Sequence, residues 1–196
     1  MDDGLWTLLV MARIAAGALK GLQLTVPRHI RATEGKVRQA LFNILGESVE
    51  GARVLDGFAG SGALGLEALS RGAARVIFLE AHPACLSAIR ENLARVPSGR
   101  CTAQTEVRRG DALRSLQALG QAGERVDLML LDPPYDGDWG KKALNAASAC
   151  GILAPSGTLC VEHARQSVLP TAVGPLALRK QHRYGDTVLS FYHVAS

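Results

Sequence analysis

Short apolar runs alternate with helical patterns along most of the chain, and this alternation constrains the fold more than any other feature. The apolar runs occupy 53–57, 75–80, 104–108, 126–132 and 157–162, and the helical patterns occupy 63–71, 83–95, 112–119 and 140–150. Strands that are apolar throughout, with helices between them, are typical of a parallel sheet covered on both faces. With right-handed crossovers, this order predicts an α/β protein with a doubly wound sheet.

Both ends of the chain depart from this alternation. Near the C-terminus, two extended runs flank the Tyr-Gly-Asp stretch at 184–186, which predicts an antiparallel hairpin that closes the sheet. Near the N-terminus, short β-like pieces broken by two glycines predict a small hairpin, and apolar residues at helical spacing over 37–45 predict a helix that ends at Gly46. We therefore expect a Rossmann-like, seven-stranded sheet, mostly parallel.

The domain organisation follows from length and composition. A chain of 196 residues is long enough for one domain with a sizeable core. We expect a single domain over 11–196, in which 11–46 form a basic hairpin and helix appended to the sheet, and a disordered leader over 1–10. No apolar run approaches the roughly 18 residues that a membrane span needs. The four cysteines are too widely spaced for a metal or disulfide framework, which indicates a cytoplasmic protein without a metal site.

Positive charge is concentrated near the N-terminus. Residues 11–40 contain six Lys or Arg side chains and one acid, Glu34, whereas the whole chain has a net charge of +4. A basic patch of this kind favours a polyanion such as RNA or DNA. An ordinary solvated surface is an equally weighted alternative for the charge cluster alone.

The first chemical motif is an acid and a glycine loop after the first core strand. Asp56 is followed by glycines at 57, 60 and 62, and then by a helix whose first N–H groups are unpaired. This spacing differs from the GxGxxG pattern of dinucleotide-binding loops, and the Asp56 carboxylate would repel a pyrophosphate. The loop therefore favours a ligand that carries positive charge.

Two further acids follow the next two strands. Glu80 ends the second strand, where it can accept hydrogen bonds from ribose hydroxyls, and Asp111 follows the third, where it can accept from an adenine amino group. Either acid alone is more often a helix cap or a loop residue. Three acids at adjacent strand ends predict one crevice for a ligand with an adenosine and a positive charge, which S-adenosylmethionine satisfies.

The second chemical motif is Asp-Pro-Pro-Tyr at 132–135, after the fourth strand. An exocyclic amine is a poor nucleophile because its lone pair is delocalised into the ring. The Asp132 carboxylate and a backbone carbonyl held by Pro133 and Pro134 can accept the two amine protons and aim the lone pair. Tyr135 offers a ring on which a base can stack. A proline-rich loop capped by an acid is the alternative, and the position beside the glycine loop favours the catalytic interpretation.

These motifs, together with the stretches 13–24, 31–45 and 184–192, resemble the RsmD family of bacterial guanine-N2 methyltransferases of small-subunit ribosomal RNA. The resemblance implies N2-methylation of a guanine in 16S RNA, in the 30S subunit or its precursor, by a monomer. It implies cofactor contacts by Asp56, Phe58, Ala59, Gly60, Gly62, Glu80, Asp111 and Ala112, and base contacts by Asp132, Pro133, Pro134 and Tyr135. It also implies RNA contacts by the N-terminal segment, for which the candidates are Arg13, Lys20, Arg31, Thr33, Arg38 and Asn43. The chain departs from the family pattern at Ala32, Gly35 and Gly57.

Two other hypotheses stay open from the residues alone. The same chemistry suits adenine in DNA, guanine in transfer RNA or a glutamine side chain in a protein. A non-catalytic RNA-binding module with the same fold is the other hypothesis, because a fold does not establish an activity.

Overall fold

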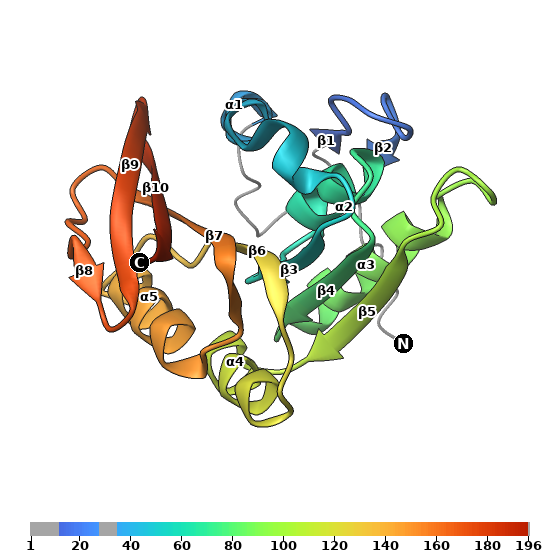
Figure 1. The fold of residues 1–196 in the computed structure, drawn as a ribbon. Coiled ribbons are helices and arrows are strands. Elements are labelled where there is room, and N and C mark those ends of the chain that lie inside the picture. The colour runs from blue at the N-terminus through green and yellow to red at the C-terminus, as the bar shows by residue number, and fades with distance from the viewer. Residues whose placement is uncertain (1–11, 28–34, 196) are drawn as a thin grey trace, which may run out of the picture.

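The computed structural model describes residues 12–27 and 35–195 and contains an eight-stranded sheet beside a two-stranded one (Figure 1). The strands are β1 (Ala12–Arg13), β2 (Gln23–Leu24), β3 (Arg53–Gly57), β4 (Arg75–Glu80), β5 (Gln104–Arg109), β6 (Val126–Leu131), β7 (Leu153–Ala164), β8 (Ala172–Val173), β9 (Leu176–Tyr184) and β10 (Thr187–Val194). The helices are α1 (Gly35–Leu45), the 3-10 helix η1 (Gly46–Val49), α2 (Ala63–Ser70), α3 (Pro83–Ala94), α4 (Ala112–Gln121) and α5 (Trp139–Cys150).

The large sheet has the order β5-β4-β3-β6-β7-β10-β9-β8. Strands β3 to β7 are parallel, and β10 pairs antiparallel with both β7 and β9. The predicted parallel sheet, the C-terminal hairpin and the N-terminal β1–β2 hairpin are therefore confirmed. The strand count was wrong by one, because the two-residue β8 adds an eighth strand by pairing with the edge of β9.

Two hydrophobic cores cover the two faces of the sheet. One contains α1, α2, α3 and the β1–β2 hairpin, and the other contains α4 and α5, which pack side by side (Figure 1). Successive β4 residues alternate between them: Phe78 belongs to the first core, and Ile77 and Leu79 belong to the second. This arrangement explains why the parallel strands are apolar throughout, since both of their faces are buried.

The β1–β2 hairpin is pinned to α2 by side chains of that helix. The buried Glu67 carboxylate accepts hydrogen bonds from the backbone N–H groups of Ala15 and Ala16, at 2.8 and 3.1 Å. At Gly17, with φ of 81°, a Cβ atom would lie only 1.8 Å from the Ser70 carbonyl oxygen. The hairpin expected as an appendage is thus an integral part of the first core.

Several sequence-based predictions fall outside the described residues. These are the leader over 1–10 and the RNA-contact candidates Arg31 and Thr33, in the stretch 28–34. Over the ranges that the structure describes, no helix is long and apolar enough to cross a membrane.

Candidate active site

Asp56 is buried at the end of β3 and fixes the start of α2. Its Oδ2 atom accepts a hydrogen bond of 2.8 Å from the Gly65 N–H, in the first turn of the helix. A Cβ atom at Gly65 would lie 2.2 Å from the Phe78 ring, so this glycine allows the helix to approach β4 closely. Burial, followed by the nearby charges of Asp132 and Glu80, raises the pKa of Asp56 well above its ordinary value. A cationic ligand would favour the ionised form of this carboxyl group.

The loop between β3 and α2 is held in a tight conformation. Phe58 has a φ of 63° and is the one residue other than glycine with a positive φ among the described residues. Such a conformation costs energy for a side chain this large, and strain of this kind often occurs at functional sites. Gly60 also has a positive φ, and its N–H donates to Glu80 Oε2 at 2.7 Å. The loop is therefore tied to the end of β4.

Glu80 and Asp111 both organise the backbone around the crevice. Glu80 Oε1 accepts hydrogen bonds from the N–H groups of Ala81 and His82, at 2.8 and 2.7 Å. Asp111 caps α4, because its Oδ1 atom accepts from the Arg114 N–H at 2.9 Å. Asp111 thus has the capping role weighed for it, whereas the N-cap of α3 is His82 and not Glu80. Both carboxylates have lone pairs for further donors. Their contacts with ribose and adenine stay predictions.

A cavity of 540 Å³ joins the two motifs. Every predicted catalytic and cofactor-binding residue except Gly62 lines it. Gly62 instead stands at the start of α2 in a left-handed conformation, with φ of 79°, where a Cβ atom would press on Ile89 and Phe78 at 3.2 and 3.3 Å. Gly62 shapes the loop from behind the cavity rather than lining it.

Trp139 is a cavity residue that the sequence analysis missed. It begins α5 and packs edge-on against Phe58, with ring centroids 6.2 Å apart. The predicted helix started one residue later, at position 140, so Trp139 was left in the preceding loop. The sequence feature that could have identified Trp139 as a site residue is its aromatic ring four positions after Tyr135, in a chain with few aromatic residues.

Tyr135 is held by hydrogen bonds from two other strands. Its hydroxyl group donates to Glu162 Oε1 on β7 at 2.7 Å and forms a 2.9 Å hydrogen bond with Thr187 Oγ1 on β10. Burial, with the negative charge of Glu162, raises the pKa of Tyr135 above its ordinary value, so the side chain is a neutral phenol. The half-buried ring is therefore fixed beside Asp132 at the edge of the cavity.

The cavity fits S-adenosylmethionine by size, charge and wall chemistry. Its volume lies within the roughly 300–1,000 Å³ of small-molecule sites. Three acids, Asp56, Glu80 and Asp111, surround it and would favour a ligand with ammonium and sulfonium charges. The apolar walls formed by Leu79 and Ala112 suit a planar adenine ring. Over residues 12–27 and 35–195, no cluster of three or more His, Cys, Asp or Glu is arranged to hold a metal ion.

One predicted RNA contact is wrong. Arg38 is only 2% exposed, lies 3.6 Å from the Glu67 carboxylate, and donates to the Arg13 carbonyl oxygen at 2.6 Å. Burial lowers the pKa of this guanidinium, and the position beside Glu67 partly offsets that effect. Arg38 therefore connects α1 to α2 and to the hairpin instead of facing RNA. Arg13, Lys20 and Asn43 are exposed, and their RNA contacts stay predictions.

Comparison with known proteins gives the family. The family model described as "Conserved hypothetical protein 95", which is the RsmD family, matches residues 12–193. The chain belongs to this family. It is 32% identical over 182 residues to "Ribosomal RNA small subunit methyltransferase D" of Escherichia coli, covering 92% of this chain and 88% of the relative. It is 34% identical to YlbH of Bacillus subtilis, covering 92% and 97%.

The solved structures agree with the RsmD-family assignment. Escherichia coli yhhF superposes with a TM-score of 0.80 at 31% identity, covering 95% of this chain and 99% of that one. SMU.776, solved in complex with SAH, is 13% identical with a TM-score of 0.68, which shows a common fold alone. Membership of this methyltransferase family confirms S-adenosylmethionine as the predicted cofactor.

Proposed function

We propose that this RsmD-family chain methylates the exocyclic N2 of a guanine in small-subunit ribosomal RNA, with S-adenosylmethionine as the methyl donor. The observation that carries the proposal is that the acids at the ends of β3 and β4 and the acid after β5 line the same cavity as Asp132, Pro133 and Tyr135. The names of the bacterial relatives support ribosomal RNA as the substrate class.

Asp132 and the proline-held backbone carbonyl orient the amine in this mechanism. Each accepts a hydrogen bond from one amine proton, which draws the nitrogen toward tetrahedral geometry and directs its lone pair at the methyl carbon. When bound, S-adenosylmethionine supplies a methyl group whose bond to sulfur breaks as its bond to nitrogen forms. The Asp132 carboxylate then accepts the proton that the methylated nitrogen loses. Tyr135 holds the base by stacking, with its ring anchored by Glu162.

The wider setting belongs to the same proposal. Residues 11–196 act as a single methyltransferase domain, as a monomer in the cytoplasm, on the 30S subunit or its precursor. The target base must reach a site at the sheet edge, so it is flipped out of its stack or already unstacked.

Radiolabelled S-adenosylmethionine tests the proposal with 30S subunits that lack the modification. The expected result is label in 16S RNA that is released by nuclease digestion as N2-methylguanine. Label in 23S RNA, transfer RNA, DNA or protein would contradict the substrate assignment. Cofactor binding without transfer to any of these substrates would instead support the non-catalytic RNA-binding hypothesis.

A further inference from the structure

A second cavity, of 670 Å³, lies on the other side of Tyr135. We call it the hairpin groove. Its lining comes from the start of α1, the end of β7 and the turn between β9 and β10, and consists of Lys36, Val37, Tyr135, Ala164, Gln166, Tyr184, Gly185, Asp186 and Thr187. The groove thus brings together the N-terminal and C-terminal parts of the chain beside the candidate active site.

Tyr135 forms part of the wall of both cavities. Its hydroxyl group is hydrogen-bonded to Thr187, which is the first residue of β10 and also lines the hairpin groove. The groove and the cofactor cavity are therefore adjoining spaces with one fixed aromatic ring between them. An RNA strand with its target base on Tyr135 can therefore place a neighbouring nucleotide in this groove.

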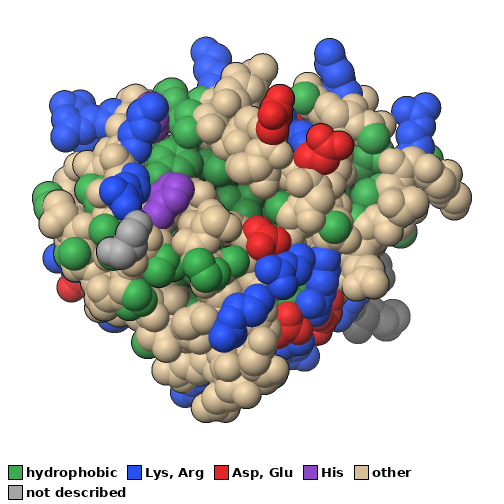
Figure 2. Space-filling view, viewed as in Figure 1, with side chains coloured by type: hydrophobic (Ala, Val, Ile, Leu, Met, Phe, Trp, Pro, Cys, Tyr) green, Lys and Arg blue, Asp and Glu red, His purple; other side chains and the backbone are tan. Residues whose placement is uncertain are grey.

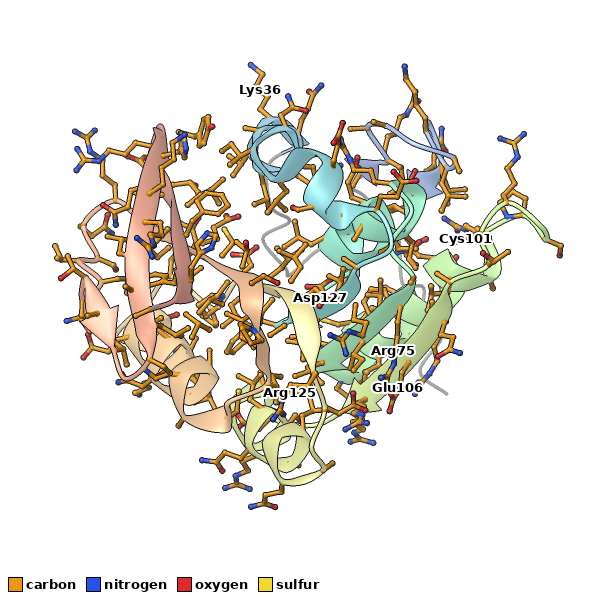
Figure 3. All side chains as sticks on the ribbon, in the orientation of Figure 1. Lys36, Arg75, Cys101, Glu106, Arg125 and Asp127 are labelled. Carbon is orange, nitrogen blue, oxygen red and sulfur yellow. The ribbon has the colours of Figure 1, made fainter. Side chains whose placement is uncertain are left out.

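The hairpin groove has one cation and one acid in its lining, Lys36 and Asp186, and an excess of cations on the neighbouring strand β9. From position 163 onward the chain has four Lys or Arg side chains and a single acid, Asp186. Three of these cations, Arg179, Lys180 and Arg183, are exposed on β9, outside the lining of the groove. On the opposite side, Lys36 is exposed at the start of α1 and extends away from the molecule (Figure 3). Figure 2 shows Lys and Arg side chains on either side of the hollow between α1 and the β9–β10 hairpin.

Tyr184 provides an aromatic surface in this groove. The half-buried ring lies nearly parallel to the His182 ring, at 18° and 6.5 Å between centroids, and His182 packs edge-on against the buried Phe191. The Tyr184 ring is therefore supported by His182 and by the first core, and it also forms part of the groove lining. Aromatic rings of this kind bind unstacked bases, and each stacked base contributes about 1–3 kcal/mol.

We propose that the hairpin groove holds the single-stranded RNA next to the target base, with the neighbouring base stacked on Tyr184 and a phosphate paired with Lys36. This inference rests on the proposed function, since it assumes that the substrate is RNA. It adds a C-terminal RNA-binding element, the β9–β10 hairpin, to the N-terminal basic segment. Recognition then depends on two segments far apart in the sequence that meet at Tyr135.

Steady-state kinetics on undermethylated 30S subunits test the role of Tyr184. Tyr184→Ala should raise the KM for the subunit about 5- to 150-fold, the equivalent of one lost stacking contact. Tyr184→Phe keeps the ring and should stay close to the unchanged protein. The Kd for S-adenosylmethionine should not change in either variant, and thermal unfolding checks that both are folded. An unchanged KM in Tyr184→Ala would overturn the proposal.

Lys36 is tested separately because an exposed lysine can be removed without disturbing the core. Lys36→Ala should weaken 30S binding. It should also make the negative slope of log K against log salt concentration shallower by about one. The matched control is Arg125→Ala, since Arg125 lies at the opposite end of the molecule (Figure 3) and should leave the slope unchanged. Equal slopes for Lys36→Ala and the unchanged protein would contradict the phosphate contact.

Photo-crosslinking tests the proposed RNA contact in the hairpin groove independently of the proposed methylation reaction. Subunits that carry 4-thiouridine in their 16S RNA should crosslink to a peptide containing Tyr184 or Lys36. A crosslink without formation of N2-methylguanine would retain the groove and reject the proposed reaction. Formation of N2-methylguanine without this crosslink, and with a normal KM in Tyr184→Ala, would retain the reaction and reject the groove.

Discussion

The cofactor cavity and the hairpin groove meet at Tyr135, but they are built in opposite ways. The cofactor cavity is formed by the ends of neighbouring parallel strands, and each strand contributes an acid at its end or within two residues of it. The groove is formed by Lys36 and Val37 on one side and by 164–187 on the other. A site made from repeated local units can be recognised from spacing, whereas a site made from distant segments depends on how those segments pack.

The difference also concerns what holds each wall in place. Backbone hydrogen bonds to Asp56 and Glu80 fix the cofactor loop directly. The α1 wall of the groove depends instead on a buried charge cluster, in which Glu67 pairs with Arg38 and Arg71. Substitutions in the two cavities should therefore have different effects. Those in the cofactor cavity should reduce methyl transfer, whereas those at the groove should reduce stability or RNA affinity.

The largest expected effect is on methyl transfer. Asp132→Asn removes the carboxylate that we propose orients the amine, and kcat should fall about 10²- to 10³-fold, as for loss of one preorganised hydrogen-bonding partner. Affinity for S-adenosylmethionine, measured by calorimetry, should be largely retained. Asp136→Asn is the matched control, because Asp136 is exposed and lines neither cavity. Full activity in Asp132→Asn would refute the role of this carboxylate.

The second expected effect is on the α1 wall of the groove. Glu67→Gln keeps the shape of the side chain but leaves the buried Arg38 without its charge partner, so the free energy of unfolding should fall by about 3 kcal/mol or more. Urea denaturation measures the change. Glu91→Gln, at an exposed i,i+4 pair with Arg95, should change stability by no more than about 1 kcal/mol. Equal losses in the two variants would show that the buried cluster does not hold α1.

The third expected effect concerns Tyr135, whose ring lies between the two cavities. Tyr135→Phe retains the stacking surface but removes the donor to Glu162 and the hydrogen bond to Thr187. A hydrogen bond to a charged group contributes about 1.5–3 kcal/mol to stability, so the free energy of unfolding should fall by about this amount. The KM for 30S subunits should change much less than in Tyr135→Ala, which also removes the ring. A KM that rises equally in both variants would show that the hydroxyl group, and not the ring, binds the substrate.

Much of the fold could be predicted because it depends on local patterns. Strands β3 and β4 have the predicted bounds, since each is an apolar run that ends at a glycine or an acid. β7 was predicted to start at 157 but starts at Leu153, because Pro155-Ser156-Gly157 is typical of a turn and here lies within an irregular strand. β8 has only two residues and forms because the β9 edge is available for pairing, which no local pattern indicates.

The site divides in the same way. Asp56, Glu80 and Asp132 could be found because the ends of parallel strands meet at one edge. Arg38 was misassigned because, among the cations of a basic segment, only packing distinguishes a buried partner of Glu67 from a surface residue. Tyr184 was noted as part of a turn and of the family-like stretch 184–192, but not as a site residue, since its place in one cavity with Tyr135 depends on β9 pairing with β10 and β10 with β7. The residues of the cofactor cavity could therefore be predicted from motif spacing, whereas those expected to face RNA could be identified only from tertiary packing.

The smallest expected effect is a pH dependence specific to the cofactor cavity. Because the pKa of Asp56 is raised in the folded protein, the folded state binds more protons than the unfolded state at pH values above the ordinary carboxyl pKa. Stability of the cofactor-free protein should therefore decrease as the pH rises through this range. Asp56→Asn should remove that decrease, whereas Asp136→Asn should retain it, as measured by urea denaturation between pH 4 and pH 8.

Cofactor affinity should show the opposite dependence on pH. A cationic ligand favours the ionised carboxylate, so binding of S-adenosylmethionine should tighten as the pH rises, and Asp56→Asn should weaken binding and flatten the dependence. Binding of 30S subunits through the hairpin groove should not follow this profile, because Asp56 does not line the groove. If subunit binding followed the Asp56 profile, the two cavities would act as one coupled site rather than as neighbours that share a ring.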